Sequence, residues 1–326
     1  YMLLGLMAAA FMVIPIRLIW PALHAVSRSH PAELPLKALS STSDNATARG
    51  TTMRNGKKFF AGLDIGSTTS KAVLFNEDRV LISDDIIDTK FDREASGKEV
   101  LENICKKFGI ERSELDAIGI TGYGRYSYKD AQTIVPEILC HANGTEFMAP
   151  GVKTIIDIGG QDNKVIEVDN GSVTKFEMND KCAAGTGRFY EVLSHRLLNV
   201  GIDELGTLAL KSTHPVTLSS MCTVFAESEV VSYLSQGTPM EDICRGILIS
   251  SAKRIRGMSA AARVNIREPI VLSGGIALNA AAAPVFSEIF GKTITSLDKP
   301  QLSAAIGVAL FAIDQYEERC QHEKNT

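Results

Sequence analysis

The chain is poor in aromatic residues, in cysteine and in excess positive charge. Only 6% of its 326 residues are aromatic and six are cysteine, too few thiols for a disulfide-stabilised secreted scaffold. Lysine and arginine number 34 against 38 aspartates and glutamates, a net charge of −4, whereas proteins that coat nucleic acid usually present a basic face. We therefore expect a cytoplasmic protein that binds no nucleic acid and uses its cysteines as buried thiols or metal ligands.

The first fifty residues differ in character from the rest. Residues 2–16 are almost purely apolar, but an arginine and two prolines interrupt the apolar stretch before it reaches the ~20 residues of a membrane-spanning helix. No basic region precedes it, as a signal peptide requires, and residues 36–52 have the polar composition of a linker. We expect Met53 to be the natural start and residues 1–52 to be a disordered extension or upstream or fused sequence. A membrane anchor or a signal segment is the alternative.

From residue 58 onward, short strands and helices follow one plan twice. Each half begins with a strand hairpin, continues with a third strand, and then alternates helices and strands. The predicted strands are 58–63, 71–76, 79–87, 116–121, 153–158, 163–168, 171–178 and 269–272, and the predicted helices are 97–108, 133–147, 186–198, 202–210, 223–234, 240–263, 277–290 and 303–317. This duplication predicts two related α/β lobes, residues 53–150 and 151–318, that face each other across a cleft, and a tail at 319–326.

Both halves carry Asp-Ile-Gly at the first hairpin turn, at residues 64–66 and 157–159. After Gly66 the first turn continues with three hydroxyl side chains and then Lys71, a set of donors and charge suited to a phosphate chain. Asp64 and Asp157 are suited to hold Mg²⁺ through waters. Gln161 and Asp162 follow the second turn, where one of them would orient the attacking water. One such turn is usually only a turn, but two in matching contexts predict a nucleotide clamp.

A third motif, Ser273–Asn279, ends a predicted strand and opens a helix. Its glycines would let a ribose or a flat ring approach the backbone, so we expect it at the adenosine; a plain strand-to-helix turn is the alternative. The predicted catalytic residues are Asp64, Asp157 and Gln161, and the predicted nucleotide-binding residues are Gly66, Ser67, Thr68, Thr69, Lys71, Gly159, Gly160, Asp162, Gly274, Gly275 and Asn279.

In order and spacing, the three motifs resemble those of the actin, Hsp70 and sugar-kinase ATPase superfamily. Lesser connecting motifs resemble it around Glu137–His141 and Ala304–Gly307. The resemblance implies a two-lobed, actin-like α/β fold of duplicated ribonuclease H-like domains, with the nucleotide in the cleft between the lobes.

Two of the cysteines, Cys182 and Cys222, immediately precede predicted helices. A thiolate at a helix N-terminus gains from the helix dipole and from free N–H donors, and an anionic iron–sulfur cluster gains in the same way. A [4Fe–4S] cluster normally needs four thiolates, and two chains about a two-fold axis would supply them. The alternative is that both cysteines are small buried residues.

The segments Lys181–Phe189 and Met221–Glu229 closely resemble the activators of 2-hydroxyacyl-CoA dehydratases, the BadF/BcrA-type ATPases, and the resemblance extends over about residues 58–316. It implies a homodimer with one [4Fe–4S] cluster bound by Cys182 and Cys222 of each subunit, together with ATP and Mg²⁺. It further implies electron receipt from ferredoxin or flavodoxin, and ATP hydrolysis that drives a low-potential electron to a partner dehydratase.

Three other functions are compatible with parts of this pattern. An ATPase subunit of a benzoyl-CoA-reductase-type enzyme shares the same motifs. A small-molecule kinase of the superfamily would need a substrate pocket with a catalytic carboxylate, and usually larger inserted subdomains, but not the two cysteines. A filament protein of the actin class would need polymerisation surfaces and no iron.

Overall fold

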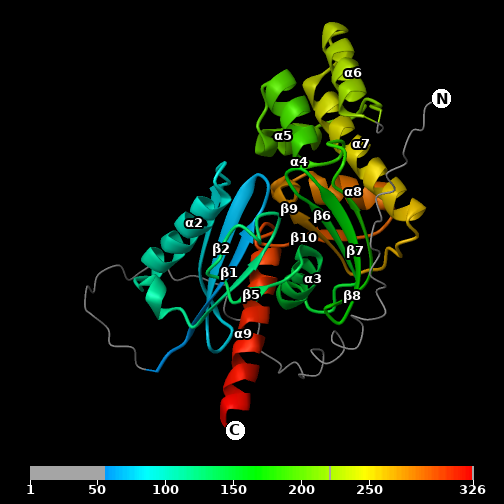
Figure 1. Cartoon of the computed structure of the whole chain (residues 1–326). Coiled ribbons are helices and arrows are strands. Elements are labelled where there is room, and N and C mark those ends of the chain that lie inside the picture. The colour runs from blue at the N-terminus through cyan, green and yellow to red at the C-terminus, as the bar shows by residue number, and fades with distance from the viewer. Residues whose placement is uncertain (1–55, 220–221, 325–326) are drawn as a thin grey trace, which may run out of the picture. The chain divides into compact units, whose positions relative to one another are not determined.

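The computed structural model describes residues 56–219 and 222–324. The expectations for residues 1–52 lie outside the described residues. Within the described part of the chain, no helix is both long and apolar enough to cross a membrane. These described residues form one compact unit built on two five-stranded sheets (Figure 1).

The first sheet has the strand order β3-β2-β1-β4-β5. Its antiparallel strands are β1 (Phe59–Ile65), β2 (Thr69–Asn76) and β3 (Leu81–Asp88), and β4 (Ala117–Thr121) and β5 (Thr133–Ile134) continue it in parallel. Every residue of β1 is buried, because helices cover both faces of the sheet. Helix α2 (Arg93–Phe108) packs on one face, and it begins where the Asp92 carboxylate accepts a hydrogen bond from Ala95 N–H and ends at left-handed Gly109.

The second sheet repeats this arrangement in the order β10-β9-β6-β7-β8. Strands β6 (Thr154–Ile158), β7 (Asn163–Asp169) and β8 (Ser172–Asn179) are antiparallel, and β9 (Ile270–Gly274) and β10 (Ile294–Ser296) are parallel additions. The helices of this half are α4 (Gly187–Tyr190), the π-helix η3 (Glu191–Leu198), α5 (Ile202–Ala209), α6 (Thr223–Ser235), α7 (Met240–Ala261) and α8 (Ala282–Phe290).

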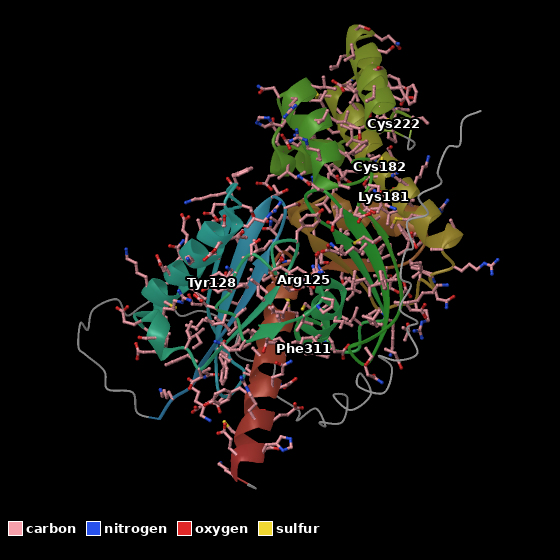
Figure 2. All side chains as sticks on the ribbon, viewed as in Figure 1. Arg125, Tyr128, Lys181, Cys182, Cys222 and Phe311 are labelled. Atoms are coloured by element: carbon pink, nitrogen blue, oxygen red, sulfur yellow. The ribbon has the colours of Figure 1, made fainter. Side chains whose placement is uncertain are left out.

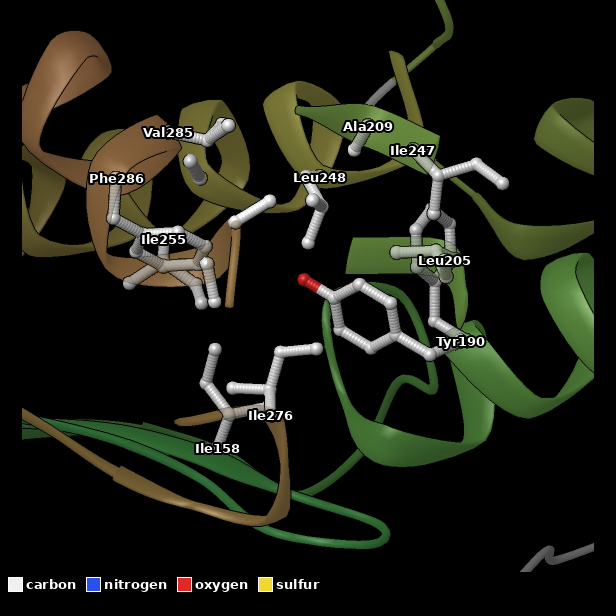
Figure 3. Packing of buried hydrophobic residues seen from close by; sticks show 14 of the residues in the cluster. Ile158, Tyr190, Leu205, Ala209, Ile247, Leu248, Ile255, Ile276, Val285 and Phe286 are labelled. Carbon is white, nitrogen blue, oxygen red and sulfur yellow. The ribbon is translucent and has the colours of Figure 1, made fainter. Parts of the chain in front are cut away.

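The largest hydrophobic core lies between the second sheet and these helices. Figure 3 shows the ring of Tyr190 lying among aliphatic side chains of α5, α7 and the end of β6, including Leu205, Leu248 and Ile158. Tyr190 is the last residue of the short helix α4, so this core fixes the position of that helix relative to the sheet.

The two lobes exchange one helix each. Helix α3 (Glu137–Met148) follows the first sheet in sequence but packs on the second, whereas α9 (Ser303–Lys324) follows the second sheet and packs on β1, β2 and β4 of the first. The helices touch closely because Gly144 faces the Ser303 carbonyl and Gly307 faces the Cys140 carbonyl, where a Cβ on either glycine would overlap the oxygen. The end of the predicted second lobe therefore belongs to the first sheet.

The predicted two-lobed α/β fold is confirmed, and each predicted strand is present within two residues of its predicted ends. Three predictions about helices were wrong. The predicted helix 133–147 starts as strand β5 and becomes helical only after Pro136, because a residue before proline avoids the α conformation. The predicted helix 277–290 is split into a 3₁₀ turn, Gly275–Leu278, and α8. Helix α9 continues to Lys324, through most of the predicted tail.

Candidate functional site

A cavity of about 430 Å³ lies between the two sheets, and both Asp-Ile-Gly turns line it. The structure brings most of the predicted nucleotide residues to its wall: Asp64, Gly66, Ser67, Thr68, Thr69, Lys71, Asp157, Gly159, Gly160, Asp162, Gly274 and Gly275. Residues that are far apart in sequence thus converge on one concave site, the usual place for a small ligand between two lobes.

Each lobe places an aspartate–lysine pair at the end of its central hairpin. In the first lobe Asp64 lies opposite Lys71, with 3.0 Å between Oδ2 and Nζ, and in the second Asp157 lies opposite Lys164, with 3.2 Å. The sequence analysis missed Lys164. Its signal was present, because Lys71 and Lys164 follow their aspartates at the same spacing. The duplication therefore extends from the turns into the charged groups of the site.

Lys164 is surrounded by three carboxylates. Its Nζ lies 2.7 Å from Glu137, 2.8 Å from Asp162 and 3.2 Å from Asp157, and its side chain is 1% exposed. Burial alone would lower the pKa of the Lys164 ammonium, but the charges of Asp157, Glu137 and Asp162 hold it well above the usual value. The ammonium is therefore charged and permits three acidic groups to share one wall of the cavity.

The three carboxylates differ in their acidity. Burial would raise the pKa of Asp157, but the charges of His141 and Lys164 and the Ser273 hydroxyl, which donates at 2.8 Å, hold it below the usual range. The pKa of Glu137 is likewise lowered: burial opposes this, and Lys164 and His141 outweigh it. For Asp162 burial prevails, and its pKa is raised. Asp162 is thus the most basic carboxylate of the group, while Asp157 is firmly ionised.

His141 joins the connecting helices to this group. Its Nε2 lies 3.5 Å from Glu137 and 3.7 Å from Asp157, and its Nδ1 shares a 3.0 Å hydrogen bond with the Ser303 hydroxyl at the start of α9. Burial would lower the pKa of His141, but the charge of Asp157 and the hydrogen bond to Glu137 raise it. The sequence analysis noticed Glu137–His141 only as a connecting motif; the structure places both side chains in the site wall.

The turn at residues 64–69 and the turn at residues 157–162, which we call the first and second phosphate-type turns, face each other directly. A Cβ on Gly160 would overlap the Thr68 hydroxyl, and one on Gly159 would overlap the Asp162 carboxylate. Glycine at residue 160 therefore lets the two turns approach each other with no side chain between them. Gly66 N–H donates to the Thr69 carbonyl at 3.1 Å and closes the first turn.

The far end of the cavity is built from the Ser273–Asn279 motif and the π-helix. Gly274 has φ +83°, and a Cβ there would overlap the Ile158 carbonyl, so the backbone requires glycine. The cavity is also lined by Tyr190, the last residue of α4, and by Glu191, Ser194 and His195 of the π-helix. π-Helical turns are uncommon and often mark functional sites. The sequence predicted an ordinary helix here and gave no sign of these lining residues.

Two of the predicted catalytic and nucleotide-binding residues do not line the cavity. Gln161 is exposed on the second turn. Asn279 is buried and fully used by the backbone, because its amide donates to the Ile202 carbonyl at 2.7 Å and its oxygen accepts from Ala281 N–H at 3.0 Å. Asn279 thereby fastens the start of α5 to the motif behind the cavity.

The two cysteines occupy different local structures. Cys222 is the N-cap of α6, as predicted. Cys182 lies farther from a helix than predicted, in the loop between β8 and α4, where the Asn179 side chain holds its peptide by donating to the Cys182 carbonyl (2.8 Å) and accepting from its N–H (3.2 Å). The helix-dipole argument therefore applies to Cys222 and not directly to Cys182.

Both cysteine loops rest on the same turn of α7. The Ser250 hydroxyl donates to the Ser219 carbonyl at 3.1 Å, close to Cys222, and Gly185, close to Cys182, packs against Ser251 and Arg254. Both thiols are half-buried. Figure 2 shows Cys182 and Cys222 at the end of the second lobe that carries α6 and α7. Among the described residues no group of three or more acidic, histidine or cysteine side chains could hold a metal by itself.

The second phosphate-type turn is bonded to the Cys182 loop. The Gly159 and Gly160 carbonyls accept from the N–H groups of Gly187 and Arg188, each at 2.8 Å, at the start of α4. One step away, the Asn163 side chain donates to the Gly185 carbonyl at 3.0 Å. A displacement of this turn would therefore reach Cys182 through three hydrogen bonds.

Residues 61–312 match the family model described as the BadF/BadG/BcrA/BcrD ATPase family. The chain belongs to this family. It is 42% identical to the 2-hydroxyisocaproyl-CoA dehydratase activator of Clostridioides difficile over 265 residues, 81% of this chain and 98% of the relative. It is also 42% identical to the (R)-2-hydroxyglutaryl-CoA dehydratase activating ATPase of Acidaminococcus fermentans over 252 residues, 77% and 95% of the two chains.

The fold agrees with this family. The solved structure of the activator of the 2-hydroxyisocaproyl-CoA dehydratase from Clostridium difficile with bound ADPNP has a TM-score of 0.76 and 40% identity, covering 81% of this chain and 97% of that one. The family resemblance and the ATPase class predicted from the sequence are confirmed.

Proposed function

We propose that this protein is an ATP-dependent activator of a 2-hydroxyacyl-CoA dehydratase. In this proposal it works as a homodimer that holds one [4Fe–4S] cluster through Cys182 and Cys222 of each subunit, and ATP hydrolysis is coupled to transfer of a low-potential electron. The observation that carries the proposal is the direct bonding of the second phosphate-type turn to the Cys182 loop. A kinase has no need for this connection, because it delivers the phosphate to a substrate in the cleft.

The thiols fit half of a shared cluster. Cys182 and Cys222 are half-buried, lie on loops that converge on one turn of α7, and one of them begins a helix whose N–H groups favour negative charge. Each chain supplies two thiolates, so a second copy would complete the four that the cluster needs. When bound, such a cluster would supply a one-electron site between a donor and the dehydratase. We assign the role of donor to reduced ferredoxin or flavodoxin.

The charged wall of the cavity suits ATP hydrolysis. We assign Asp64 and Asp157 to Mg²⁺, held through waters, and Lys71 with the hydroxyls of Ser67, Thr68 and Thr69 to the phosphates. Asp162 is better placed than Gln161 to orient the attacking water, since it lines the cavity and its pKa is raised, whereas Gln161 is exposed. A γ-phosphate bound by both turns would hold them together, and its loss would let the second turn move with α4 and the Cys182 loop.

The test separates the iron from the nucleotide. Anaerobically purified protein should contain about four irons per dimer and show an EPR signal when reduced that changes when ATP is added. Cys182→Ala should remove the iron and keep ATP binding, and Asp157→Ala should keep the iron and lose ATP turnover. Cys320→Ala, a half-buried cysteine on α9, is the matched control. Iron-free protein, or equal loss of ATP binding in both variants, would refute the assignment.

A further inference from the structure

Exposed aromatic side chains gather on the first lobe beside the first phosphate-type turn. Phe91 is fully exposed, Tyr126 is 74% exposed and Tyr123 is 69% exposed. The Arg93 guanidinium lies over the Tyr123 ring at 5.6 Å, and that of Arg125 lies over the Tyr126 ring at 4.7 Å. We call Phe91, Arg93, Tyr123, Arg125 and Tyr126 the rim patch. Phe91 lies just before α2 and Arg93 is the first residue of that helix. Figure 1 shows α2 beside the first sheet, and Figure 2 labels Arg125.

The rim patch has the composition of a protein-binding surface. Tyrosine, phenylalanine and arginine are the residues enriched at the centres of protein interfaces. Within residues 56–219 and 222–324, neither Arg93 nor Arg125 forms an ion pair, since the nearby Asp92 caps α2 and Glu94 pairs with Lys98. The patch thus offers apolar rings together with two positive charges, which is complementary to a surface that carries carboxylates.

Both segments of the rim patch are fastened to the first phosphate-type turn. Thr89, next to the Phe91 segment, donates its N–H to the Thr68 carbonyl at 2.8 Å and its hydroxyl to the Gly66 carbonyl at 3.1 Å. In the other segment, Gly124 N–H donates to the Ile65 carbonyl at 2.8 Å, and a Cβ on Gly124 would press on the Ile65 side chain. The patch is therefore joined to the turn by hydrogen bonds, so a displacement of the turn would reach it.

We propose that the rim patch is the docking surface for the electron-accepting dehydratase, engaged through a carboxylate-bearing face of that enzyme. This inference rests on the proposed function. A partner that responds to hydrolysis must interact differently with the two nucleotide states, and the rim patch is joined to an element that contacts the phosphates. The other two partners do not require the rim patch. The electron donor needs only to reach the thiols, and in the proposed dimer the second copy contacts the cysteine loops of the other lobe.

The rim patch and the Cys182 loop are joined through the two phosphate-type turns. The patch is bonded to the first turn, the first turn faces the second at Thr68 and Gly160, and the second is bonded to the Cys182 loop. A dehydratase that bridges the mouth of the cleft would contact both lobes and would stabilise one separation of them. By linkage, the factor by which ATP changes dehydratase affinity equals the factor by which the dehydratase changes ATP affinity.

The experiment uses the anaerobic holoprotein and the 2-hydroxyisocaproyl-CoA dehydratase of Clostridioides difficile as the probe. The double variant Phe91→Ser/Tyr126→Ser removes two rings that do not line the nucleotide cavity. Its control is Phe176→Ser, which removes a 47%-exposed ring from β8 of the other lobe. We expect the double variant to keep its dehydratase-free ATPase rate and iron, to bind the dehydratase at least ~10-fold more weakly, and to lose the effect of the dehydratase on ATP affinity. The control should match the unmodified protein.

The outcomes separate the two proposals. If the unmodified protein neither binds nor activates the dehydratase, the proposed function falls and the docking surface with it. If it activates the dehydratase and the double variant does so equally well, only the docking surface is overturned. A double variant that becomes monomeric in light scattering would assign the patch to a second copy, and one that loses only reduction by ferredoxin would assign it to the donor; either result overturns the proposal.

Discussion

Replacing Lys164 with methionine should destabilise the protein strongly and in a pH-dependent way. The ammonium is 1% exposed and lies within 3.2 Å of three carboxylates, and methionine fills similar space without charge. Breaking a buried ion pair by removing one partner costs about 3–5 kcal/mol of folding free energy, because the remaining charges stay buried. We expect a loss of this size at pH 7. Lys71→Met is the control: Lys71 is more exposed and contacts one carboxylate at 3.0 Å, so about 1.5–3 kcal/mol should be lost, the value of a charged hydrogen bond.

The pH dependence of the loss identifies its cause. In the unmodified protein the pKa values of Asp157 and Glu137 are lowered, so their contribution to stability is present above about pH 4, the unfolded value, and disappears as the pH falls through the folded pKa values. Without Lys164, burial raises the pKa of these carboxylates. The folded variant then binds more protons than the unfolded chain, and its stability rises as the pH falls from 7 towards 5.

Urea unfolding followed by circular dichroism, at pH 5, 6, 7 and 8 and without nucleotide, measures both effects. The difference in unfolding free energy between Lys164→Met and the unmodified protein should be largest at pH 7–8 and should shrink at pH 5. A difference that stays constant over this range, or that is no larger than for Lys71→Met, would show that the three carboxylates do not depend on the Lys164 charge.

Three further changes test the remaining contacts. Asn163→Ala removes the only side-chain bond described between the second turn's hairpin and Gly185. ATP turnover should stay within about threefold, which is less than about 1 kcal/mol, while the ATP-induced change in the EPR signal is lost. An unchanged spectral response would show that the coupling does not need the Asn163 amide. Gly160→Ala should weaken ATP binding at least ~10-fold in calorimetry, because the new Cβ overlaps the Thr68 hydroxyl. The control is Gly257→Ala on α7, where no atom lies within 4 Å of the new Cβ. This control should bind ATP normally and gain about 0.5–1 kcal/mol of folding free energy. If Asp162 orients the attacking water, Asp162→Asn should keep ATP binding and hydrolyse ATP at least ~10²-fold more slowly. Gln161→Ala should hydrolyse ATP at a near-normal rate. A larger loss of hydrolysis in Gln161→Ala than in Asp162→Asn would assign the water-orienting role to Gln161.

The two turns could be predicted from the sequence because Asp-Ile-Gly occurs in both halves. An exact repeat can be recognised without knowing how the chain packs. It missed the charged wall because Lys164 lies on the returning strand, and its meaning depends on the register that sets it opposite Asp157. Gln161 and Asp162 show the same limit. Both follow the turn, and only the bend of the backbone decides that Asp162 enters the cavity while Gln161 faces solvent. The exchange of α3 and α9 depends on close contacts between glycines and backbone carbonyls. The spacing of hydrophobic residues in the sequence does not predict such contacts.

The proposed coupling between the nucleotide and the cysteines runs mainly through backbone hydrogen bonds. The Gly159 and Gly160 carbonyls hold α4 through N–H groups, so no side-chain substitution removes these bonds without altering the turn itself. Asn163 is different, because its side chain reaches Gly185 from a buried position beside the turn and outside the cavity wall. If hydrolysis drives the cysteine loop through rigid backbone alone, losing the Asn163 amide should leave the response intact. If movement of the loop requires hydrogen bonds at both Gly185 and Gly187, substitution of Asn163 alone should separate ATP hydrolysis from electron release.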